Sequence, residues 1–228
     1  MAATVGIVVF PGSNCEHDVA EAGSRLGATA RLVLHKEQSL GQVDAVVLPG
    51  GFAHGDALRP GAIARFSPVM AAVERFAADG GPVIGICNGF QVLCEAGLLP
   101  GALQKNRDLA FLCQEVELVT VSERSALTTG VPRGTPLRVP INHFEGCYTA
   151  YPEVLAGLEE RDQVVLRYVG NPNGSAGDIA GISNEAGNVV GLMPHPERAS
   201  HDLLGSEDGN VLLTALLKSA VRSPALLR

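Results

Sequence analysis

The chain has 228 residues and a net charge of −7, with 46% hydrophobic and 18% charged residues. This composition is typical of an ordered globular protein, and a negative charge without any run of Lys or Arg argues against a nucleic-acid-binding surface. Five cysteines without a Cys-x-x-Cys pair argue against a disulfide framework or a zinc ribbon. We find no signal peptide or membrane-length apolar stretch, so we expect a soluble, cytoplasmic protein that contacts neither nucleic acid nor membrane.

The first half of the chain alternates short apolar runs with helical patterns. The apolar runs predict strands at residues 5–10, 31–34, 43–48 and 83–86. Helices are expected at residues 15–26, 60–78 and 90–96. The second helix is expected to bury Ile63, Phe66, Met70, Val73 and Phe76. Strands that are continuously apolar and separated by helices are typical of a parallel sheet that is covered on both faces.

From Gln114 onward the pattern becomes β-rich. Strands are predicted at residues 116–121, 137–141, 164–169, 179–184 and 189–193, and residues 185–188 are expected to close a hairpin between the last two. A closing helix at 208–221 is expected to turn Val211, Leu212, Ala215 and Leu216 inward. We find no linker, so we expect one domain over residues 1–228. Its predicted fold is α/β, with a mostly parallel central sheet flanked by helices on both faces and extended by the second half.

Cys87 is the strongest candidate for chemistry in the chain. It directly follows the apolar run 82–86 and has a glycine two positions away on each side, at Gly85 and Gly89. Small neighbours permit the tight strand-to-helix turn called a nucleophile elbow, which projects a side chain from the carboxyl edge of a sheet. The turn also places the thiol at the positive end of a helix dipole. The pattern therefore predicts a cysteine nucleophile.

A cysteine nucleophile needs a base and a group that orients the base. His195 follows the predicted strand 189–193 and lies between Pro194 and Pro196, which stiffen its presentation. Glu197 is near enough to accept a hydrogen bond from the imidazole. We expect Cys87 to attack a carbonyl carbon, His195 to move the proton and Glu197 to hold His195 in one tautomer.

Each of these residues also has an ordinary interpretation. Cys87 could be a buried core cysteine, His195 a histidine in a loop and Glu197 a solvated surface carboxylate. The glycine pair and the His-Pro-Glu segment together favour the catalytic interpretation. The remaining cysteines lack the glycine-flanked turn and are expected to be structural: Cys15, Cys94, Cys113 and Cys147.

Attack by a thiolate requires hydrogen-bond donors for the oxyanion. One donor is expected to be the backbone N–H of Asn88, next to the nucleophile. The other is expected in the segment after strand 43–48, where Gly50 and Gly51 can turn the N–H of Gly51 or Phe52 into the site. The alternative is an ordinary turn at the end of a strand.

The sequence offers no convincing metal or cofactor site. Residues 15–18 read Cys-Glu-His-Asp, but neighbouring residues on a helix point in different directions and do not converge on one ion. None of the three lysines stands in a P-loop, and no Gly-x-Gly-x-x-Gly opens a helix after a strand. We therefore expect this chain to bind no metal, ATP or nicotinamide cofactor.

Three motifs together resemble the signatures of class I (triad) glutamine amidotransferases. They are Pro-Gly-Gly at 49–51, Gly-Ile-Cys-Asn-Gly-Phe-Gln at 85–91 and His-Pro-Glu at 195–197. The chain is similar in particular to the glutaminase subunits of phosphoribosylformylglycinamidine synthases. That resemblance covers nearly the whole chain and includes residues 10–15, 51–56, 58–59, 61–67, 171–175, 193–198 and 205–209. His54 stands where these subunits often have an aromatic residue, and His-Phe-Glu-Gly at 143–146 replaces their usual His-Gly-Glu-Gly.

The resemblance implies that the side-chain amide of L-glutamine is hydrolysed through a thioester on Cys87. It also implies that the ammonia passes to a separate synthetase subunit of the PurL type, with a small PurS-type subunit assisting assembly. That synthetase would use ATP and Mg²⁺ to convert formylglycinamide ribonucleotide to formylglycinamidine ribonucleotide in purine biosynthesis. Gly50, Gly51, Phe52, Asn88 and Gln91 match family positions around the bound glutamine.

Two other functions remain open at this point. One is a stand-alone cysteine hydrolase on the same scaffold, which would need no partner. The other is an inactive scaffold that only docks on a synthetase, for which the intact Cys87, His195 and Glu197 would have no chemical use.

Overall fold

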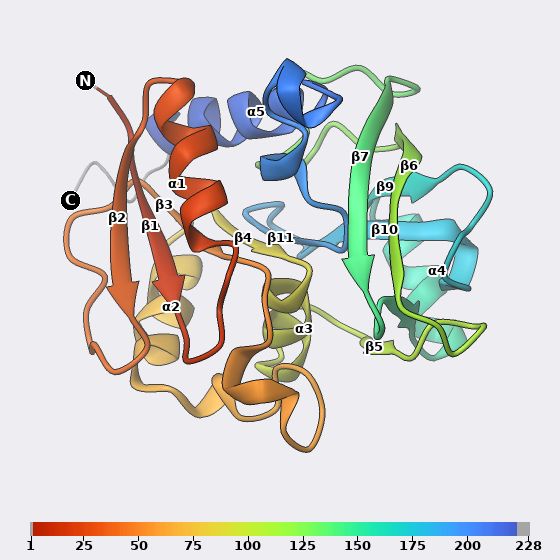
Figure 1. Cartoon of the computed structure of the whole chain (residues 1–228), viewed down its shortest axis with the longest axis horizontal. Coiled ribbons are helices and arrows are strands. Elements are labelled where there is room, and N and C mark those ends of the chain that lie inside the picture. The colour runs from red at the N-terminus through yellow and green to blue at the C-terminus, as the bar shows by residue number, and fades with distance from the viewer. Residues whose placement is uncertain (1, 223–228) are drawn as a thin grey trace.

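One nine-stranded sheet runs through the computed structural model of the chain, which describes residues 2–222 (Figure 1). The strand order is β2-β1-β3-β4-β11-β10-β9-β6-β7, and a second sheet pairs β5 with β8. The strands are β1 (Thr4–Val9), β2 (Thr29–Leu34), β3 (Ala45–Leu48), β4 (Val83–Ile86), β5 (Ala102–Gln104), β6 (Leu112–Thr120), β7 (Pro136–His143), β8 (Cys147–Thr149), β9 (Val164–Tyr168), β10 (Ile179–Ser183) and β11 (Val189–Leu192).

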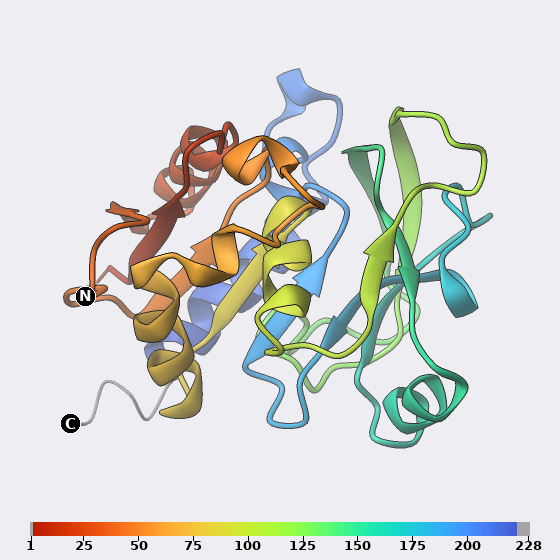
Figure 2. The ribbon, with the colours of Figure 1, turned by 90° about the horizontal axis from the view of Figure 1, so that it is seen from below.

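The large sheet has a parallel half and an antiparallel half. From β2 to β11 every neighbouring pair is parallel, and from β11 to β7 every pair is antiparallel. Figure 2 shows the two halves side by side, with the red and orange strands on the left and the green and cyan strands on the right. The expected fold class is confirmed, including the extension of the sheet by the second half. This continuity supports one domain, although residues 223–228 of the expected range lie outside the described residues.

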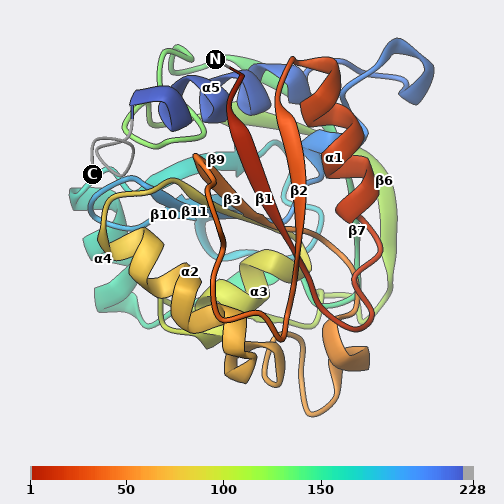
Figure 3. The same ribbon diagram turned by 90° about the vertical axis from the view of Figure 1, so that its left-hand side faces the viewer.

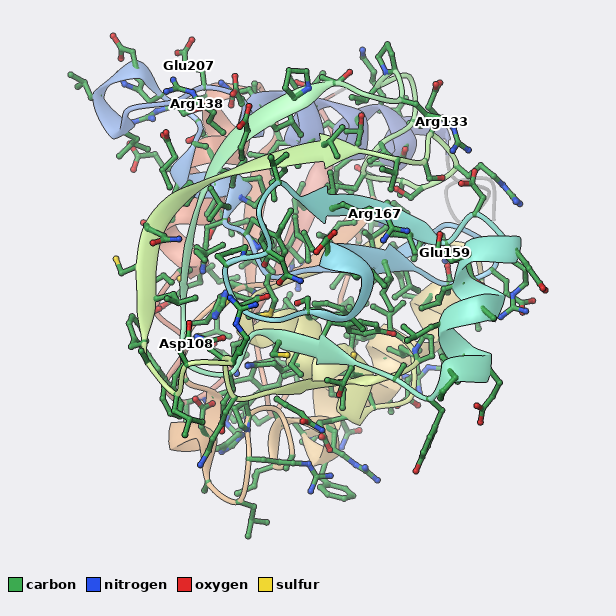
Figure 4. All side chains as sticks on the ribbon, turned by 90° about the vertical axis from the view of Figure 1, so that its right-hand side faces the viewer. Asp108, Arg133, Arg138, Glu159, Arg167 and Glu207 are labelled. Atoms are coloured by element: carbon green, nitrogen blue, oxygen red, sulfur yellow. The ribbon has the colours of Figure 1, made fainter. Side chains whose placement is uncertain are left out.

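Helices cover both faces of the parallel half. The helices are α1 (Glu16–Arg25), α2 (Pro68–Ala78), α3 (Asn88–Glu95), α4 (Pro152–Glu160) and α5 (Gly209–Arg222). α1 and α5 lie on one face, and α2 and α3 lie on the other (Figure 3). α4 lies beside the antiparallel half, where its Glu159 pairs with Arg167 of β9 (Figure 4). Within residues 2–222 no helix combines the length and the apolar character that crossing a membrane would require.

The centre of the sheet brings the sequence motifs together. β4 pairs in parallel with β3 on one side and with β11 on the other, so the three carboxyl ends meet at one edge. All residues of these three strands are buried, which explains their continuously apolar sequences. The segments that follow the three strands carry Gly50, Cys87 and His195. Pairing in the sheet therefore assembles residues that are far apart in the chain.

The structure corrects the expected helix at residues 60–78. A 3-10 turn (Ala64–Phe66) precedes α2, and Ser67 between them is extended, with ψ 140°. Pro68 starts α2 because its ring fixes φ and disfavours a helical residue before it. Ile63 and Phe66 therefore do not face inward and are 37% and 74% exposed.

Smaller elements differ as well. Val211 was expected inside but is 38% exposed, because α5 turns Leu212 and Leu216 toward the core. β5, β8 and α4 were not predicted from the sequence. Two of these are three-residue strands, which are too short to display a period.

Substitution of Gly89 tests the packing of α3 against β3. A Cβ at this position would lie 1.9 Å from the carbonyl oxygen of Leu48, a backbone atom that cannot move aside alone. We expect Gly89→Ala to lower the free energy of unfolding by about 3 kcal/mol, measured by urea denaturation. Gly23→Ala in α1 is the matched control. Its Cβ would meet nothing closer than 3.9 Å, so it should raise stability by about 0.5–1 kcal/mol. Equal effects of the two changes would contradict this account.

Candidate active site

A cavity of about 440 Å³ opens at the carboxyl ends of the central strands. Cys87 and His195 both line it, as do Gly51 and Phe52 from the turn after β3. The opposite side is formed by the segment that joins β7 to β8. Clefts at this edge of an α/β sheet are the usual place for catalytic groups, so the cavity is the candidate active site.

Cys87 lies in a strained turn between β4 and α3, with φ 51° and ψ −106°. Two glycines make this turn feasible: a Cβ at Gly89 would strike the Leu48 oxygen, and one at Gly85 would lie 2.6 Å from the Gly89 backbone. Such strain costs about 1–3 kcal/mol and persists only where the surroundings hold it. Here the N–H of Cys87 donates to the Leu192 carbonyl at 2.7 Å. The predicted tight turn from strand to helix at Cys87 is confirmed.

His195 directly precedes the 3-10 turn after β11 (Pro196–Arg198), which contains Glu197, and each of the two residues is only 1% exposed. The imidazole Nδ1 and the carboxylate Oε1 are 2.6 Å apart. The backbone of His195 is fixed as well, because its N–H donates to the Pro140 carbonyl at 2.9 Å. Gly50 makes room for the ring, since a Cβ there would lie 2.7 Å from Cε1 of His195. The structure thus brings the predicted base and its predicted orienting carboxylate into contact.

Opposing effects set the protonation of His195. Burial by itself lowers the pKa of the imidazole, but the charge of Glu197 and then that of Cys87 outweigh burial and raise the pKa well above its ordinary value. Glu197 occupies Nδ1, whereas Nε2 has no partner among residues 2–222. Nε2 is therefore the nitrogen left to exchange a proton with Cys87.

The turn after β3 only partly matches its expected role. The N–H of Phe52 donates to the Gly12 carbonyl at 2.9 Å, so it is not available to an oxyanion. The N–H of Gly51 has no acceptor within the described part of the chain. Gly51 has φ 142°, and a Cβ there would strike the backbone of Ser13 at 2.8 Å. Asn88 begins α3, so its N–H is one of the unpaired donors at a helix start. Gly51 and Asn88 remain the two candidate donors.

Gln91 lines the cavity, as expected, but its amide is already engaged. Its Nε2 donates to the Glu145 carbonyl at 2.6 Å, and its Oε1 accepts from the side chain of Asn88 at 2.9 Å. The Asn88 side chain also accepts from the N–H of Ala53 at 3.0 Å. Both residues therefore tie α3 to the loops on either side of the cavity.

Cys15 is a cavity residue that was expected from the sequence to be structural. Its sulfur accepts a hydrogen bond from Arg198 at 3.2 Å, and its thiol contributes to the raised pKa of His195. Donor atoms of Cys15, His195 and Glu197 lie within 4.8 Å of one another, the arrangement among residues 2–222 closest to a metal site. The positive guanidinium on the same sulfur opposes a cation there. The usable signal was position, because Cys15 directly precedes α1 as Cys87 directly precedes α3.

Three charged residues at the cavity were not predicted from the sequence. Asp56, Lys105 and Glu145 all line it. Burial, reinforced by the charge of Glu145, raises the pKa of Asp56 to about 6, although a hydrogen bond from Asn88 acts in the opposite direction. Lys105 holds its ammonium 5.9 Å from the centre of the Phe144 ring. The cavity therefore presents two acidic groups and one basic group to a ligand.

Known proteins share both the sequence and the fold. Residues 2–209 match the family model of the CobB/CobQ-like glutamine amidotransferase domain. A phosphoribosylformylglycinamidine synthase subunit PurQ from Rubrobacter xylanophilus is 56% identical over 216 residues, which cover 95% of this chain and 98% of that relative. The chain belongs to the PurQ family of glutamine amidotransferases. A PurQ subunit from Salinibacter ruber is 52% identical over 227 residues, covering 95% of this chain and 97% of that relative.

Solved structures agree with this membership of the PurQ family. A chain in the structure of PurLQS from Thermotoga maritima superposes with a TM-score of 0.89 at 40% identity, covering 96% of this chain and 99% of that one. A glutamine amidotransferase from the same organism, 19% identical with a TM-score of 0.57, shares the fold. The family resemblance seen in the sequence is confirmed.

Replacing Glu197 in this glutamine amidotransferase tests what holds the His195 proton. In Glu197→Gln the carboxylate charge is gone while burial remains, so the pKa of His195 should fall, as measured by NMR titration of its ring protons. Glutaminase activity should drop by about 10⁴-fold, the loss typical when an orienting carboxylate becomes an amide. Glu207→Gln is the control, because Glu207 lies on the surface (Figure 4). An unchanged His195 pKa in the Glu197 variant would contradict the assignment.

Proposed function

We propose that this chain is the glutaminase subunit of a phosphoribosylformylglycinamidine synthase and hydrolyses L-glutamine to glutamate and ammonia. The observation that carries the proposal is the convergence of Cys87, in its strained turn, with the buried His195–Glu197 pair on one cavity. Membership of the PurQ family supports the substrate and the pathway.

The first half-reaction forms a thioester. His195 takes the proton of the Cys87 thiol, and the sulfur attacks the side-chain carbonyl carbon of glutamine. The N–H groups of Gly51 and Asn88 face the oxyanion that develops. His195 then returns its proton to the amide nitrogen, the carbon–nitrogen bond breaks, and ammonia leaves.

The second half-reaction hydrolyses the thioester. His195 takes a proton from water, the oxygen attacks the same carbon, and the bond to sulfur breaks. Cys87 recovers its proton from His195 and glutamate is released. Across both steps one glutamine and one water give one glutamate and one ammonia. Glu197 accepts the hydrogen bond from Nδ1 of His195 and stabilises the imidazolium in each step.

The charges at the cavity suit a free amino acid. Glutamine carries an α-ammonium and an α-carboxylate, and the cavity offers the pair Asp56 and Glu145 to the first and Lys105 to the second. These groups are not part of the proposed triad, so they remain available for binding. A peptide substrate would lack one or both charges, which favours glutamine over the alternative of a stand-alone peptide hydrolase.

We propose that the ammonia is used by a partner. The related chain from Thermotoga maritima belongs to a structure titled PurLQS. By analogy, this chain would assemble with a PurL-type synthetase subunit and a small PurS-type subunit. The synthetase would use ATP and Mg²⁺ to convert formylglycinamide ribonucleotide to formylglycinamidine ribonucleotide, and this chain would hold no cofactor of its own. We expect the complex to be cytoplasmic.

Replacing the nucleophile tests the proposal directly. In the complex, Cys87→Ala should abolish glutamate release from glutamine, while synthesis from added ammonium salt should survive because the partner is untouched. Glutamate release and formylglycinamidine ribonucleotide formation are the two measurements. Cys113→Ala is the matched control and should leave both unchanged, since Cys113 is exposed and outside the cavity. Glutamine-dependent synthesis by the Cys87 variant would overturn the triad.

Asp56 provides a test of substrate recognition. Because its pKa is about 6, the carboxylate is charged above pH 6 and neutral below, so KM for glutamine should rise as the pH falls through about 6. Asp56→Asn should raise KM about 10-fold at pH 7.5, corresponding to one lost charge-assisted hydrogen bond, and should flatten the dependence of KM on pH. Asp108→Asn is the control, because this exposed carboxylate does not line the cavity (Figure 4). If neither the fall in pH nor Asp56→Asn changed KM for glutamine, Asp56 would be excluded from substrate binding.

A further inference from the structure

His143 ends β7, lines the cavity and is only 4% exposed, yet the mechanism above does not use it. Its Nδ1 lies 3.1 Å from Oδ1 of Asn106. The orientation of Asn106 is fixed, because its Nδ2 donates to the carbonyls of Ala110 and His143, each at 2.9 Å. Oδ1 also accepts the N–H of Gly146 at 3.2 Å. Since Oδ1 only accepts, Nδ1 of His143 carries the hydrogen.

The other ring nitrogen is therefore an acceptor. Nε2 of His143 is buried and has no partner among residues 2–222. Burial, reinforced by the positive charge of His195, lowers the pKa of His143 to about 4, so the ring is neutral near pH 7. An unpaired buried acceptor costs about 1–3 kcal/mol, which a ligand with an N–H donor would recover.

The segment that carries His143 is firmly held. Gly146 lets the ring pack flat against the chain, since a Cβ there would lie 2.3 Å from ring atoms of His143. The Gly146 carbonyl accepts from the side chain of Asn173 at 2.8 Å, and Ser175 Oγ accepts the N–H of Tyr148 at 3.0 Å. Through these contacts the Asn-Pro-Asn-Gly-Ser stretch at 171–175 fixes the wall of the cavity. The acceptor is thus preorganised.

We propose that Nε2 of His143 accepts a hydrogen bond from the side-chain NH₂ of glutamine and thereby selects the amide against the carboxylate of the product. The inference rests on the proposed glutaminase function. Asn142, the neighbouring residue, has its carbonyl 3.7 Å from the Cys87 sulfur, so this end of β7 lies beside the proposed nucleophile. The amide directs its oxygen to the oxyanion donors and its nitrogen to His143. Glutamate instead presents oxygen lone pairs to Nε2, and the repulsion favours product release.

The experiment compares two substrates that differ in the leaving group. The leaving group of glutamine is an NH₂ with N–H donors, whereas the methoxy group of glutamate γ-methyl ester has none. Both substrates yield glutamate through the same thioester. In the complex, His143→Phe should lower kcat/KM for glutamine by about 10–100-fold and change that for the ester by less than about 3-fold. Inhibition by glutamate should tighten in the same variant. His143→Gln supplies an acceptor oxygen and should restore part of the preference for the amide.

The outcomes separate the possible errors. An equal loss on both substrates would indicate a structural role and overturn the inference, as would no loss on either. A wild-type complex that releases glutamate from neither substrate would overturn the proposed function, and this inference with it. Should the His143 variants fail to fold, the ¹⁵N resonance of His143 Nε2 in the Cys87→Ala protein tests whether this nitrogen accepts a hydrogen bond from glutamine. It should shift on addition of glutamine and not on addition of glutamate; equal responses would refute the assignment.

Discussion

The pairing of β4 with β3 on one side and β11 on the other is the constraint on which the site depends. It aligns the ends of three strands, so the turns that follow them share one cavity. The register is tied to the proposed nucleophile, because the N–H of Cys87 donates to the carbonyl of Leu192, the last residue of β11. A slip in that register would misplace both the strained turn and the His195 segment that follows β11.

Burial is what makes the His195–Glu197 contact effective. Both side chains are almost entirely buried. An unpaired charge in a buried environment would be unfavourable. Each therefore depends on the other, and the carboxylate outweighs the effect of burial on the imidazole. His143, which lines the same cavity, is paired instead with the neutral amide of Asn106, and its pKa moves down. The pKa values of two histidines at one cavity are thus shifted in opposite directions by their immediate neighbours.

The sequence was informative where a local pattern determines structure. Cys87 was identifiable because a buried strand, two glycines and a helix start are all consecutive, and His195 because it directly follows another buried strand. His143, Asp56 and Lys105 lie in or beside loops that have no period, and their roles depend on contacts with distant segments. The helix expected at 60–78 failed because Pro68 and the extended Ser67 interrupt an otherwise regular apolar spacing.

The order of strands in the sheet has a consequence for biosynthesis. β11 is inserted between β4 and β10 although it is the last strand in the chain, and His195 follows it at position 195 of 228. During translation, Cys87 emerges from the ribosome 108 residues ahead of its proposed base, His195 (195 minus 87). Domains fold as units once their long-range pairings become available. A nascent chain that has made only the first four strands holds the proposed nucleophile without its proposed base, so on this assignment ammonia production must await the synthesis of the segment after β11.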